Sequence, residues 1–340
     1  MSNSRKHINP SYKKALPKSY SIPECIAQLD TNPNVLSYLI SKAESPSRSD
    51  KAFIDEVLSN TKRKKDSKRI AVTGSPGVGK STFLNSYGAY LQKNGERIAI
   101  LPVDPTSHIS KGSILGDKTR MSDLVGHGNV LIKPMASALA LGGVAPATGT
   151  AISLCEAAGY SYIFIETVGV GQSEYAVKDL VDLFVLLIQP GGGDELQGIK
   201  RGIMELADIV VVTKADGALL QSAKDSLDSH KGALKLLNSR IEGWKTKAYL
   251  HSFKNQDYLT DLDKGIAAYF QHMHKENQLQ ELRSIQSMNL FDSGSQGIFS
   301  AFMMKRPEMM KLIDKLKSEI TKGTITGNQA LRRLEEKLDE

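Results

Sequence analysis

The sequence predicts an α/β fold in which a mostly parallel β-sheet is flanked by helices on both faces. Between Arg69 and about Ser252, short apolar runs alternate with helical segments, and this alternation is typical of βαβ units. Strands are expected in the runs 69–74, 97–104, 129–134, 162–167, 183–188, 208–216 and 248–252. After about Leu259 the strand signal ends and helical periodicity continues to the C-terminus.

These patterns divide the chain into three parts. A basic, helical N-terminal arm is predicted for residues 1–68, with disorder over 1–20 and amphipathic helices over 21–60. The α/β domain is expected over 69–258, and a C-terminal helical arm over 259–340. With 340 residues and 40% apolar content, the chain is long enough to bury a sizeable core.

Composition narrows the classes of function. The two cysteines, Cys25 and Cys155, form no CxxC pattern, which favours a reducing cytoplasm over a disulfide framework or a thiolate metal site. The longest apolar run, 181–188, is well short of the roughly 18 residues that a membrane span needs. Residues 1–69 hold 14 of the 44 Lys+Arg but only 7 of the 37 Asp+Glu, and the rest of the chain is balanced. The basic run 61–69 fits either a solvated linker or a contact with an anionic surface; we expect the linker, with no nucleic-acid or membrane partner.

A phosphate-binding loop follows the first predicted strand. GSPGVGKST matches the pattern GxxxxGK[ST] and lies between a strand and a helix, which is the structural context that this motif requires. Its backbone N–H groups are expected to surround phosphates while Lys80 reaches the β and γ oxygens and the Ser81 hydroxyl binds Mg²⁺. The predicted nucleotide-binding residues here are Gly74, Ser75, Pro76, Gly77, Val78, Gly79, Lys80, Ser81 and Thr82.

The nucleotide base is expected at a second motif, TKAD, which ends the strand 208–216. A carboxylate at Asp216 accepts two hydrogen bonds from guanine, whereas adenine presents no such pair of donors, and the Lys214 stem can cover the base. GTP is therefore favoured over ATP. Thr213 stands where most GTPases have asparagine, and the next strand ends in HSF, 251–253, in place of a Ser-Ala pair.

Carboxylates near the ends of two further strands are candidates for catalysis and for Mg²⁺. Asp104 ends the strand 97–104, and Glu166 stands where a P-loop GTPase normally has aspartate. Asp117 lies in a long loop that either contacts phosphate and metal or is simply solvated. Val170 occupies the usual place of the water-orienting glutamine, and Gln172 comes two positions later, which predicts slow intrinsic hydrolysis.

In this order, GSPGVGKST, VDPTS, GSILGDKTRM, ETVGVGQSE, PGGGDELQGIKRGIMELAD and TKAD closely resemble the methylmalonyl-CoA mutase-associated GTPases, the MeaB/ArgK family. The resemblance is dense from Arg69 to Asp216 and looser in the helical arms.

The resemblance implies a homodimeric GTPase, dimerising through its C-terminal arm, that binds a cobalamin-dependent acyl-CoA mutase. Such proteins gate delivery of the cofactor, protect the mutase and help to eject inactivated cofactor. Lys80, Asp104, Asp117 and Glu166 would be the catalytic residues, and Ser81, Asp104 and Glu166 the metal ligands. The residues that sense the mutase would be Gly169, Gln172, Asp194, Glu195 and Lys200.

Three other readings share parts of this pattern. A GTPase metallochaperone needs thiolate or imidazole clusters, and the nearest candidate, His272 with His274, places the two side chains on different faces of a helix. A signal-recognition GTPase has a similar guanine motif but not ETVGVGQSE. A transport-associated ATPase or kinase for basic amino acids would need a second substrate motif, and none is visible.

Overall fold

The computed structural model describes residues 19–61, 67–104, 121–136, 145–167, 177–191, 201–235, 239–304 and 306–322, together with 324–325, 329–330 and 333–334. The predicted disorder over 1–20 falls almost wholly outside these ranges. Eight strands form one sheet: β1 (Lys68–Gly74), β2 (Ile98–Asp104), β3 (Val130–Ile132), β4 (Met135–Ala136), β5 (Tyr162–Thr167), β6 (Leu183–Ile188), β7 (Ile209–Val212) and β8 (Lys247–Leu250).

All pairings among these strands are parallel, and the order is β3-β2-β5-β1-β6-β7-β8, with β4 pairing beside β2. The prediction of a mostly parallel sheet is confirmed, and each of the seven expected runs contains a strand. Only β4 escaped the sequence pattern, because two residues are too short to show a period of two. β1 lies in the middle, with Ala71 facing Ile165 of β5 on one side and Phe184 of β6 on the other.

Each face of the sheet buries its own apolar layer, as parallel sheets require. Ile70 and Val72 point to the face covered by α4 (Lys80–Lys93) and α11 (Gln256–Lys275). Ala71 points to the opposite face, where α6 (Ala145–Ala157) and α10 (Leu220–Leu234) contribute to the core. The remaining short helices of this region are α9 (Arg201–Leu206) and the 3₁₀ turn η1 (Gly217–Leu219).

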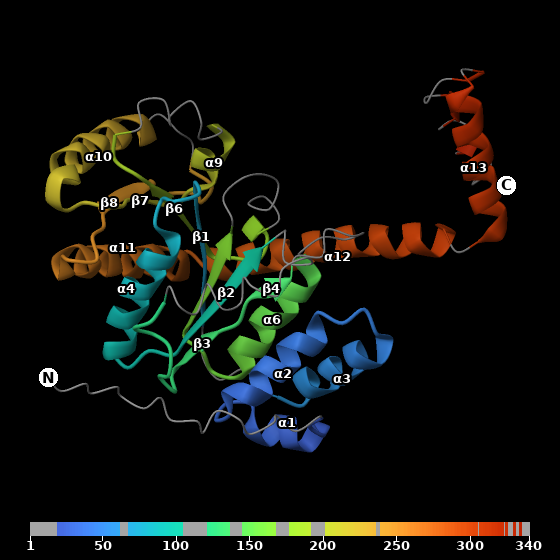
Figure 1. Cartoon of the computed structure of the whole chain (residues 1–340), viewed down its shortest axis with the longest axis horizontal. Helices are drawn as coiled ribbons and strands as arrows, with labels where there is room; N and C mark the ends of the chain where they lie inside the picture. Colours follow the sequence, from blue (N-terminus) through green and yellow to red (C-terminus); the bar gives the residue numbers. More distant parts are fainter. Residues whose placement is uncertain are drawn as a thin grey trace, which may run out of the picture.

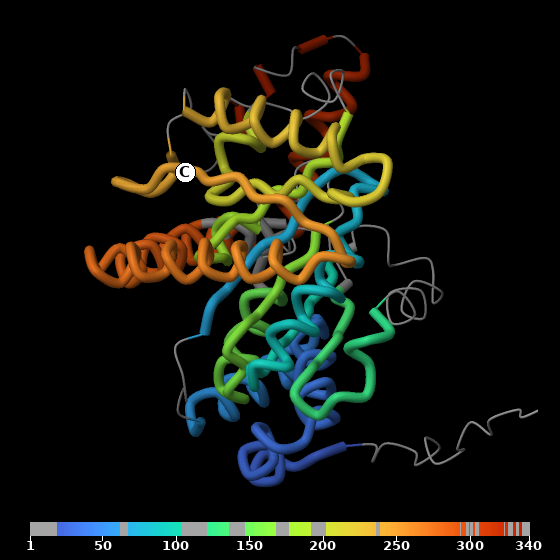
Figure 2. Tube along the Cα trace, turned by 90° about the vertical axis from the view of Figure 1, so that its left-hand side faces the viewer, coloured from blue at the N-terminus to red at the C-terminus, as the bar shows by residue number. Residues whose placement is uncertain are grey.

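The N-terminal helices form an additional layer. α1 (Ile22–Gln28), α2 (Pro33–Ala43) and α3 (Arg48–Ser59) confirm the amphipathic helices expected over 21–60. Their apolar sides, including Leu36, Leu39 and Val57, are buried in the same core cluster as α6. Figures 1 and 2 show that these helices and α10 lie at opposite ends of the molecule.

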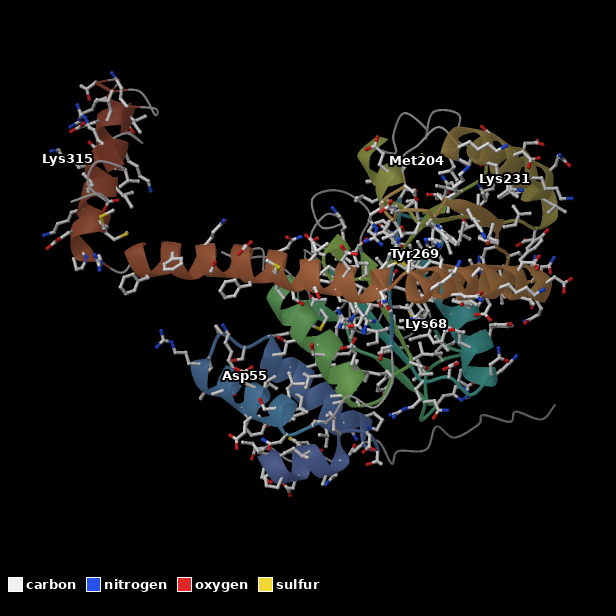
Figure 3. The ribbon with its side chains drawn as sticks, turned by 180° about the vertical axis from the view of Figure 1, so that it is seen from behind. Asp55, Lys68, Met204, Lys231, Tyr269 and Lys315 are labelled. Carbon is white, nitrogen blue, oxygen red and sulfur yellow. The ribbon has the colours of Figure 1, made fainter. Side chains whose placement is uncertain are left out.

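The described part of the C-terminal region forms three helices, of which the first is α11 (Gln256–Lys275). α11 packs on the sheet through residues such as Leu262 and Tyr269, whereas α12 (Gln278–Met304) leaves the body of the protein and leads to α13 (Pro307–Thr321), as Figures 1 and 3 show. The division at residue 259 stays a prediction. No helix in the described part of the chain is both long and apolar enough to cross a bilayer.

Buried ion pairs attach helix α12 and the segment before β8 to the amino end of the sheet. Asp182, fully buried just before β6, accepts hydrogen bonds from the Arg69 amide and from Nε and Nη2 of Arg283 on α12, at 2.9, 2.9 and 2.7 Å. Asp208, fully buried just before β7, pairs with Arg240 Nη2 at 2.6 Å. Since a buried charge that loses its partner is costly, the first pair fixes where α12 attaches, and the second fixes the segment 239–246 that precedes β8.

Replacing Arg283 tests this attachment. We expect Arg283→Met to lower the free energy of unfolding by about 3 kcal/mol, because Asp182 would stay buried without its counter-ion. Urea unfolding would measure the change. Arg306→Met, at an exposed position before α13, should change the stability by less than about 1 kcal/mol. Equal effects of the two substitutions would contradict the role given to the Asp182–Arg283 pair.

Candidate functional site

The phosphate loop connects the central strand β1 to helix α4. Gly74, Gly77 and Gly79 have φ of 151°, 80° and 104°, which side chains rarely adopt. A Cβ at Gly74 would lie 2.5 Å from the Leu187 carbonyl oxygen of β6, so this position also excludes a side chain sterically. The glycines thus allow the tight turn that points backbone N–H groups at the N-terminus of α4 toward one point.

Lys80 lies across the mouth of this loop. Its Nζ donates to the carbonyl oxygens of Gly74 and Ser75 at 2.8 and 3.2 Å. The ammonium is therefore held at the phosphate loop by backbone oxygens, and its contact with β and γ phosphate oxygens stays a prediction. Thr82 is exposed on the first turn of α4.

A hydroxyl and a carboxylate meet beside the loop. The Ser81 Oγ donates to Glu166 Oε1 at 3.3 Å, joining the first turn of α4 to the end of β5. Glu166 pairs with Val72 in β1, so the parallel register brings it to the phosphate loop. Oxygen ligands of these two types suit a hard divalent cation such as Mg²⁺, whose remaining positions would be filled by water and phosphate.

The backbone of Asp104 lies at the same edge of the sheet. Asp104 ends β2, and the preceding Val103 pairs with Thr167 at the end of β5. The structure thus brings Lys80, Ser81, Glu166 and the backbone of Asp104 to one edge. The other residues expected here lie outside the described ranges: Asp117, Gly169, Gln172, Asp194, Glu195 and Lys200.

Thr213 connects the phosphate loop to the predicted base site. Its buried Oγ1 donates to the carbonyl oxygen of Val78 at 2.7 Å and lies 3.1 Å from that of Ile188. The sequence treated this threonine as a departure from the usual asparagine. In the structure the Thr213 hydroxyl joins the phosphate loop, at Val78, to the end of β6, at Ile188.

Ser252, the middle residue of the HSF stretch that stands in place of a Ser-Ala pair, contacts the predicted base site. The Ser252 hydroxyl donates to Asp216 Oδ2 at 2.6 Å, and this bond is the main reason that the pKa of Asp216 lies below its usual value. The Lys254 ammonium lies 3.5 Å from the other carboxylate oxygen. Sequence reasoning missed Ser252 because the residue after it is Phe253 rather than alanine. The signal that could have found it is its position at the end of the last expected strand, 248–252, since parallel strands end at the same edge of the sheet.

Lys214 has an unusual backbone. Its φ of 55° is in the left-handed region, and among the described residues only Asn277 shares this feature outside glycine. The Lys214 ammonium donates to Gln189 Oε1 at 2.9 Å, and its side chain is exposed beside Asp216. The Lys214 side chain thus lies next to Asp216, and its predicted role as a cover for the nucleotide base stays a prediction.

His251, buried beneath this loop, is uncharged at neutral pH. Its Nε2 lies 2.7 Å from the Ser86 hydroxyl of α4, and its backbone pairs with Val212 and Ala215. Burial lowers the pKa of His251 to about 4, against a partial opposing effect of the Asp216 charge. Within the ranges that the structure describes, no group of three or more His, Cys, Asp or Glu side chains could hold a metal ion.

The pKa of His251 predicts an acid-sensitive fold. Because the native pKa of about 4 lies below the ordinary 6.5, the unfolded chain binds more protons between these values, and stability falls as pH falls. We expect His251 to account for about 2 kcal/mol of lost stability between pH 7 and pH 5. Urea unfolding of His251→Gln should show a smaller pH dependence by this amount, whereas His274→Gln on the exposed side of α11 should match the wild type. An unchanged pH dependence in His251→Gln would contradict the assignment.

Comparison with known proteins agrees with this geometry. The family model described as "Methylmalonyl Co-A mutase-associated GTPase MeaB" matches residues 36–305. The mouse protein named "Methylmalonic aciduria type A homolog, mitochondrial" is 47% identical over 218 residues, 64% of this chain and 52% of the mouse protein. The chain thus spans about half the length of this relative. GTPase ArgK of Escherichia coli is 40% identical over 220 residues, 65% of this chain and 66% of that protein.

A solved structure supports the same fold. The crystal structure of an LAO/AO transport system kinase superposes with a TM-score of 0.76 and 25% sequence identity, covering 96% of this chain and 100% of that one. The sheet order, the phosphate loop and these matches agree. The chain therefore belongs to the MeaB family of methylmalonyl-CoA mutase-associated GTPases, which are P-loop proteins that hydrolyse GTP.

Proposed function

We propose that this protein is a GTP-dependent switch that binds a cobalamin-dependent acyl-CoA mutase of the methylmalonyl-CoA mutase type. It would gate the loading of adenosylcobalamin, protect the loaded enzyme and help to reactivate it. The family match over residues 36–305 carries this proposal, since it includes the phosphate loop, the end of β5 and the base site in one stretch. The cytoplasm is the proposed compartment, in keeping with two cysteines that are both free and buried.

In this proposal GTP binds with its phosphates in the loop 74–82. Lys80 would exchange the two carbonyl oxygens that it now contacts for β and γ phosphate oxygens, and it would stabilise charge that develops on the transferred phosphoryl group. Mg²⁺, when bound, would neutralise phosphate charge, with Ser81 and Glu166 as its nearest protein oxygens and Asp104 and Asp117 as further candidates. Thr213, Lys214 and Asp216 would select guanine, with Asp216 oriented by Ser252.

Slow intrinsic hydrolysis follows from the sequence after Glu166. No glutamine stands directly after Gly169 to orient water, and Gln172 is displaced by two positions. We propose that the mutase accelerates hydrolysis by contacting Gly169–Gln172 and the segment that contains Asp194, Glu195 and Lys200.

We also propose a homodimer that forms through the C-terminal helices. α12 exposes Phe291, Phe299 and Phe302, whose exposed fractions are 73%, 69% and 56%. Figure 3 shows this helix and α13, which carries Lys315, standing away from the body of the protein that holds Tyr269 and Lys68. Large aromatic side chains at such exposure favour burial against a partner, and a second copy offers the same surface.

Substitution on α12 tests the dimer. We expect Phe291→Glu with Phe299→Glu to convert the dimer to a monomer, since buried like charges would oppose burial of the helix. Light scattering after size-exclusion chromatography would measure the mass. Leu219→Glu with Phe253→Glu, two exposed apolar positions on the domain body, is the matched control and should remain dimeric. A wild-type monomer at micromolar concentration would refute the proposal.

The mutase partnership can be tested with purified proteins. When the protein is mixed with a cobalamin-dependent acyl-CoA mutase from the same genome, GTP turnover should rise by roughly fivefold or more. Lys80→Ala, which removes the ammonium from the phosphate loop, should abolish turnover with or without mutase. Absence of both binding and a rate change with every such mutase of that genome would refute the partnership.

Glu166 should couple the nucleotide to Mg²⁺. We expect Glu166→Ala to weaken Mg²⁺-dependent GTP binding roughly tenfold, because a charged ligand to the metal or to its water is lost. GDP binding in the absence of Mg²⁺ should stay within about threefold of wild type, because Glu166 makes no part of the loop that holds the β-phosphate. Equilibrium titration with both nucleotides, with and without Mg²⁺, separates the two effects. Equal loss in all four titrations would instead indicate a folding defect.

A further inference from the structure

Two buried threonine hydroxyls meet at the carboxyl edge of the sheet. Thr73 precedes the first glycine of the phosphate loop, and Thr167 follows Glu166 at the end of β5. The Thr167 hydroxyl donates to Thr73 Oγ1 at 2.8 Å, and the exposed fractions of Thr167 and Thr73 are 0% and 1%. This contact joins the strand that leads into the phosphate loop to the strand that carries the candidate metal ligand Glu166.

The hydroxyl pair lies where the backbone pairing between β1 and β5 ends. The last register pair of these two strands is Val72 with Glu166. Beyond it, Thr73 continues alongside β6, whereas Thr167 continues alongside β2. The two strands thus separate at the edge where ligands bind in open parallel sheets, and the hydrogen bond between the threonines connects them there.

Packing alone does not require hydroxyls at these positions. The residues that face each other across β2, β5, β1 and β6 are Val103, Thr167, Thr73 and Leu186, and the two outer ones belong to the buried apolar core. Valine is close to threonine in shape and is common in buried parallel strands, so two valines would complete an apolar row. A hydrogen bond has a preferred length and direction, which an apolar contact lacks. The hydroxyls therefore fix the spacing of these strand ends more narrowly than valines would.

The opposite face of the same strand ends carries the candidate metal site. Side chains alternate along a strand, so Glu166 points away from its neighbour Thr167. It points toward α4, where Ser81 Oγ lies 3.3 Å from Glu166 Oε1. Ser81 is joined to the end of β1 by the phosphate loop, so the distance between the two oxygens depends on the spacing of β1 and β5. Misplacement of a catalytic group by about 1 Å can lower a rate about a hundredfold.

We propose that Thr73 and Thr167 are positioning residues for Mg²⁺-dependent GTP hydrolysis. Their hydroxyl pair holds Glu166 at the distance from Ser81 that lets both side chains serve one Mg²⁺ ion. Neither threonine would touch the metal, because both side chains are buried on the other face of the sheet. The inference rests on the Mg²⁺ site proposed above and adds the pair that sets its width.

Valine substitutions separate positioning from stability. Thr73→Val alone should lower the urea midpoint, because Thr167 keeps a buried hydroxyl without its partner. Replacing both threonines by valine removes donor and acceptor together, so the midpoint should return close to that of the wild type. Hydrolysis by this double variant should still be roughly tenfold slower at saturating GTP, and its half-maximal rate should need roughly tenfold more Mg²⁺. Affinity for GDP without Mg²⁺ should stay within about threefold of wild type, since the loop is unchanged.

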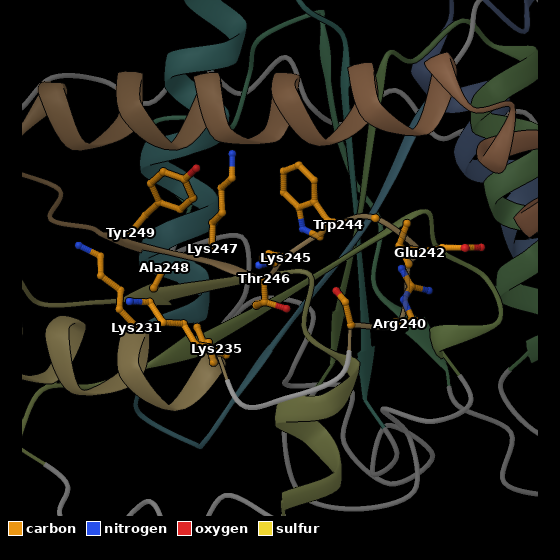
Figure 4. A pocket seen from close by; sticks show the side chains of 14 residues that line it. Lys231, Lys235, Arg240, Glu242, Trp244, Lys245, Thr246, Lys247, Ala248 and Tyr249 are labelled. Atoms are coloured by element: carbon orange, nitrogen blue, oxygen red, sulfur yellow. The ribbon is translucent and has the colours of Figure 1, made fainter.

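Two further variants serve as controls. Thr167→Ser keeps the hydroxyl but loses a buried methyl group, so it should lower the urea midpoint while hydrolysis stays within about threefold of wild type. Thr246, labelled in Figure 4, lies just before β8 at the other edge of the sheet, and its hydroxyl donates to the Ala207 carbonyl oxygen at 2.8 Å. Thr246→Val should lower the midpoint without slowing hydrolysis.

A wild-type rate and Mg²⁺ dependence in the double valine variant would overturn the proposal, since shape alone would then hold the site. So would hydrolysis by Thr167→Ser that is as slow as in the double variant, because the hydroxyl would then not be the group that matters. If the wild-type protein hydrolyses GTP equally well without Mg²⁺, the proposed metal site itself is refuted, and the role of the two threonines with it.

Discussion

The common direction of the strands is the constraint on which the rest of this structure depends. Because every described pairing is parallel, the carboxyl ends of β1, β2, β5 and β7 lie at one edge of the sheet. The phosphate loop, Asp104, Glu166 and Thr213 lie at or just after these strand ends, so they come together at that edge. A parallel sheet must also bury both faces. That requirement accounts for α4 and α11 on one side, and for α6, α10 and the N-terminal helices on the other.

The two edges of the sheet carry different kinds of polar group. At the carboxyl edge Lys80, Ser81 and Glu166 are partly exposed, and their side chains make hydrogen bonds at a surface that a ligand can reach, as between Ser81 and Glu166. At the amino edge Asp182 and Asp208 are fully buried and each is paired with an arginine. Buried pairs of this kind cost much to break. The amino edge therefore anchors α12 through Arg283 and the segment before β8 through Arg240, while the carboxyl edge keeps groups that can change partners.

Two side chains make the carboxyl edge a single unit rather than two neighbouring motifs. Thr213 links the base motif to the phosphate loop through the Val78 carbonyl oxygen, and Ser252 links Asp216 to the loop after β8. His251, beneath the same loop, contacts Ser86 on α4, the helix that begins at the phosphate loop. A change at the phosphates thus has a short, hydrogen-bonded connection to the base site.

The sequence by itself determined the α/β class, seven strands and the phosphate loop, because apolar periodicity and glycine spacing are local properties. It also predicted Lys80, Ser81 and Asp216 as site residues, since each belongs to a contiguous motif. It did not identify the contact of Ser252 with Asp216, and it did not explain Thr213 or the buried pair of Asp208 with Arg240. Those features depend on which strands are neighbours and on which polar atoms are buried, and both are decided only when segments far apart in the chain pack together.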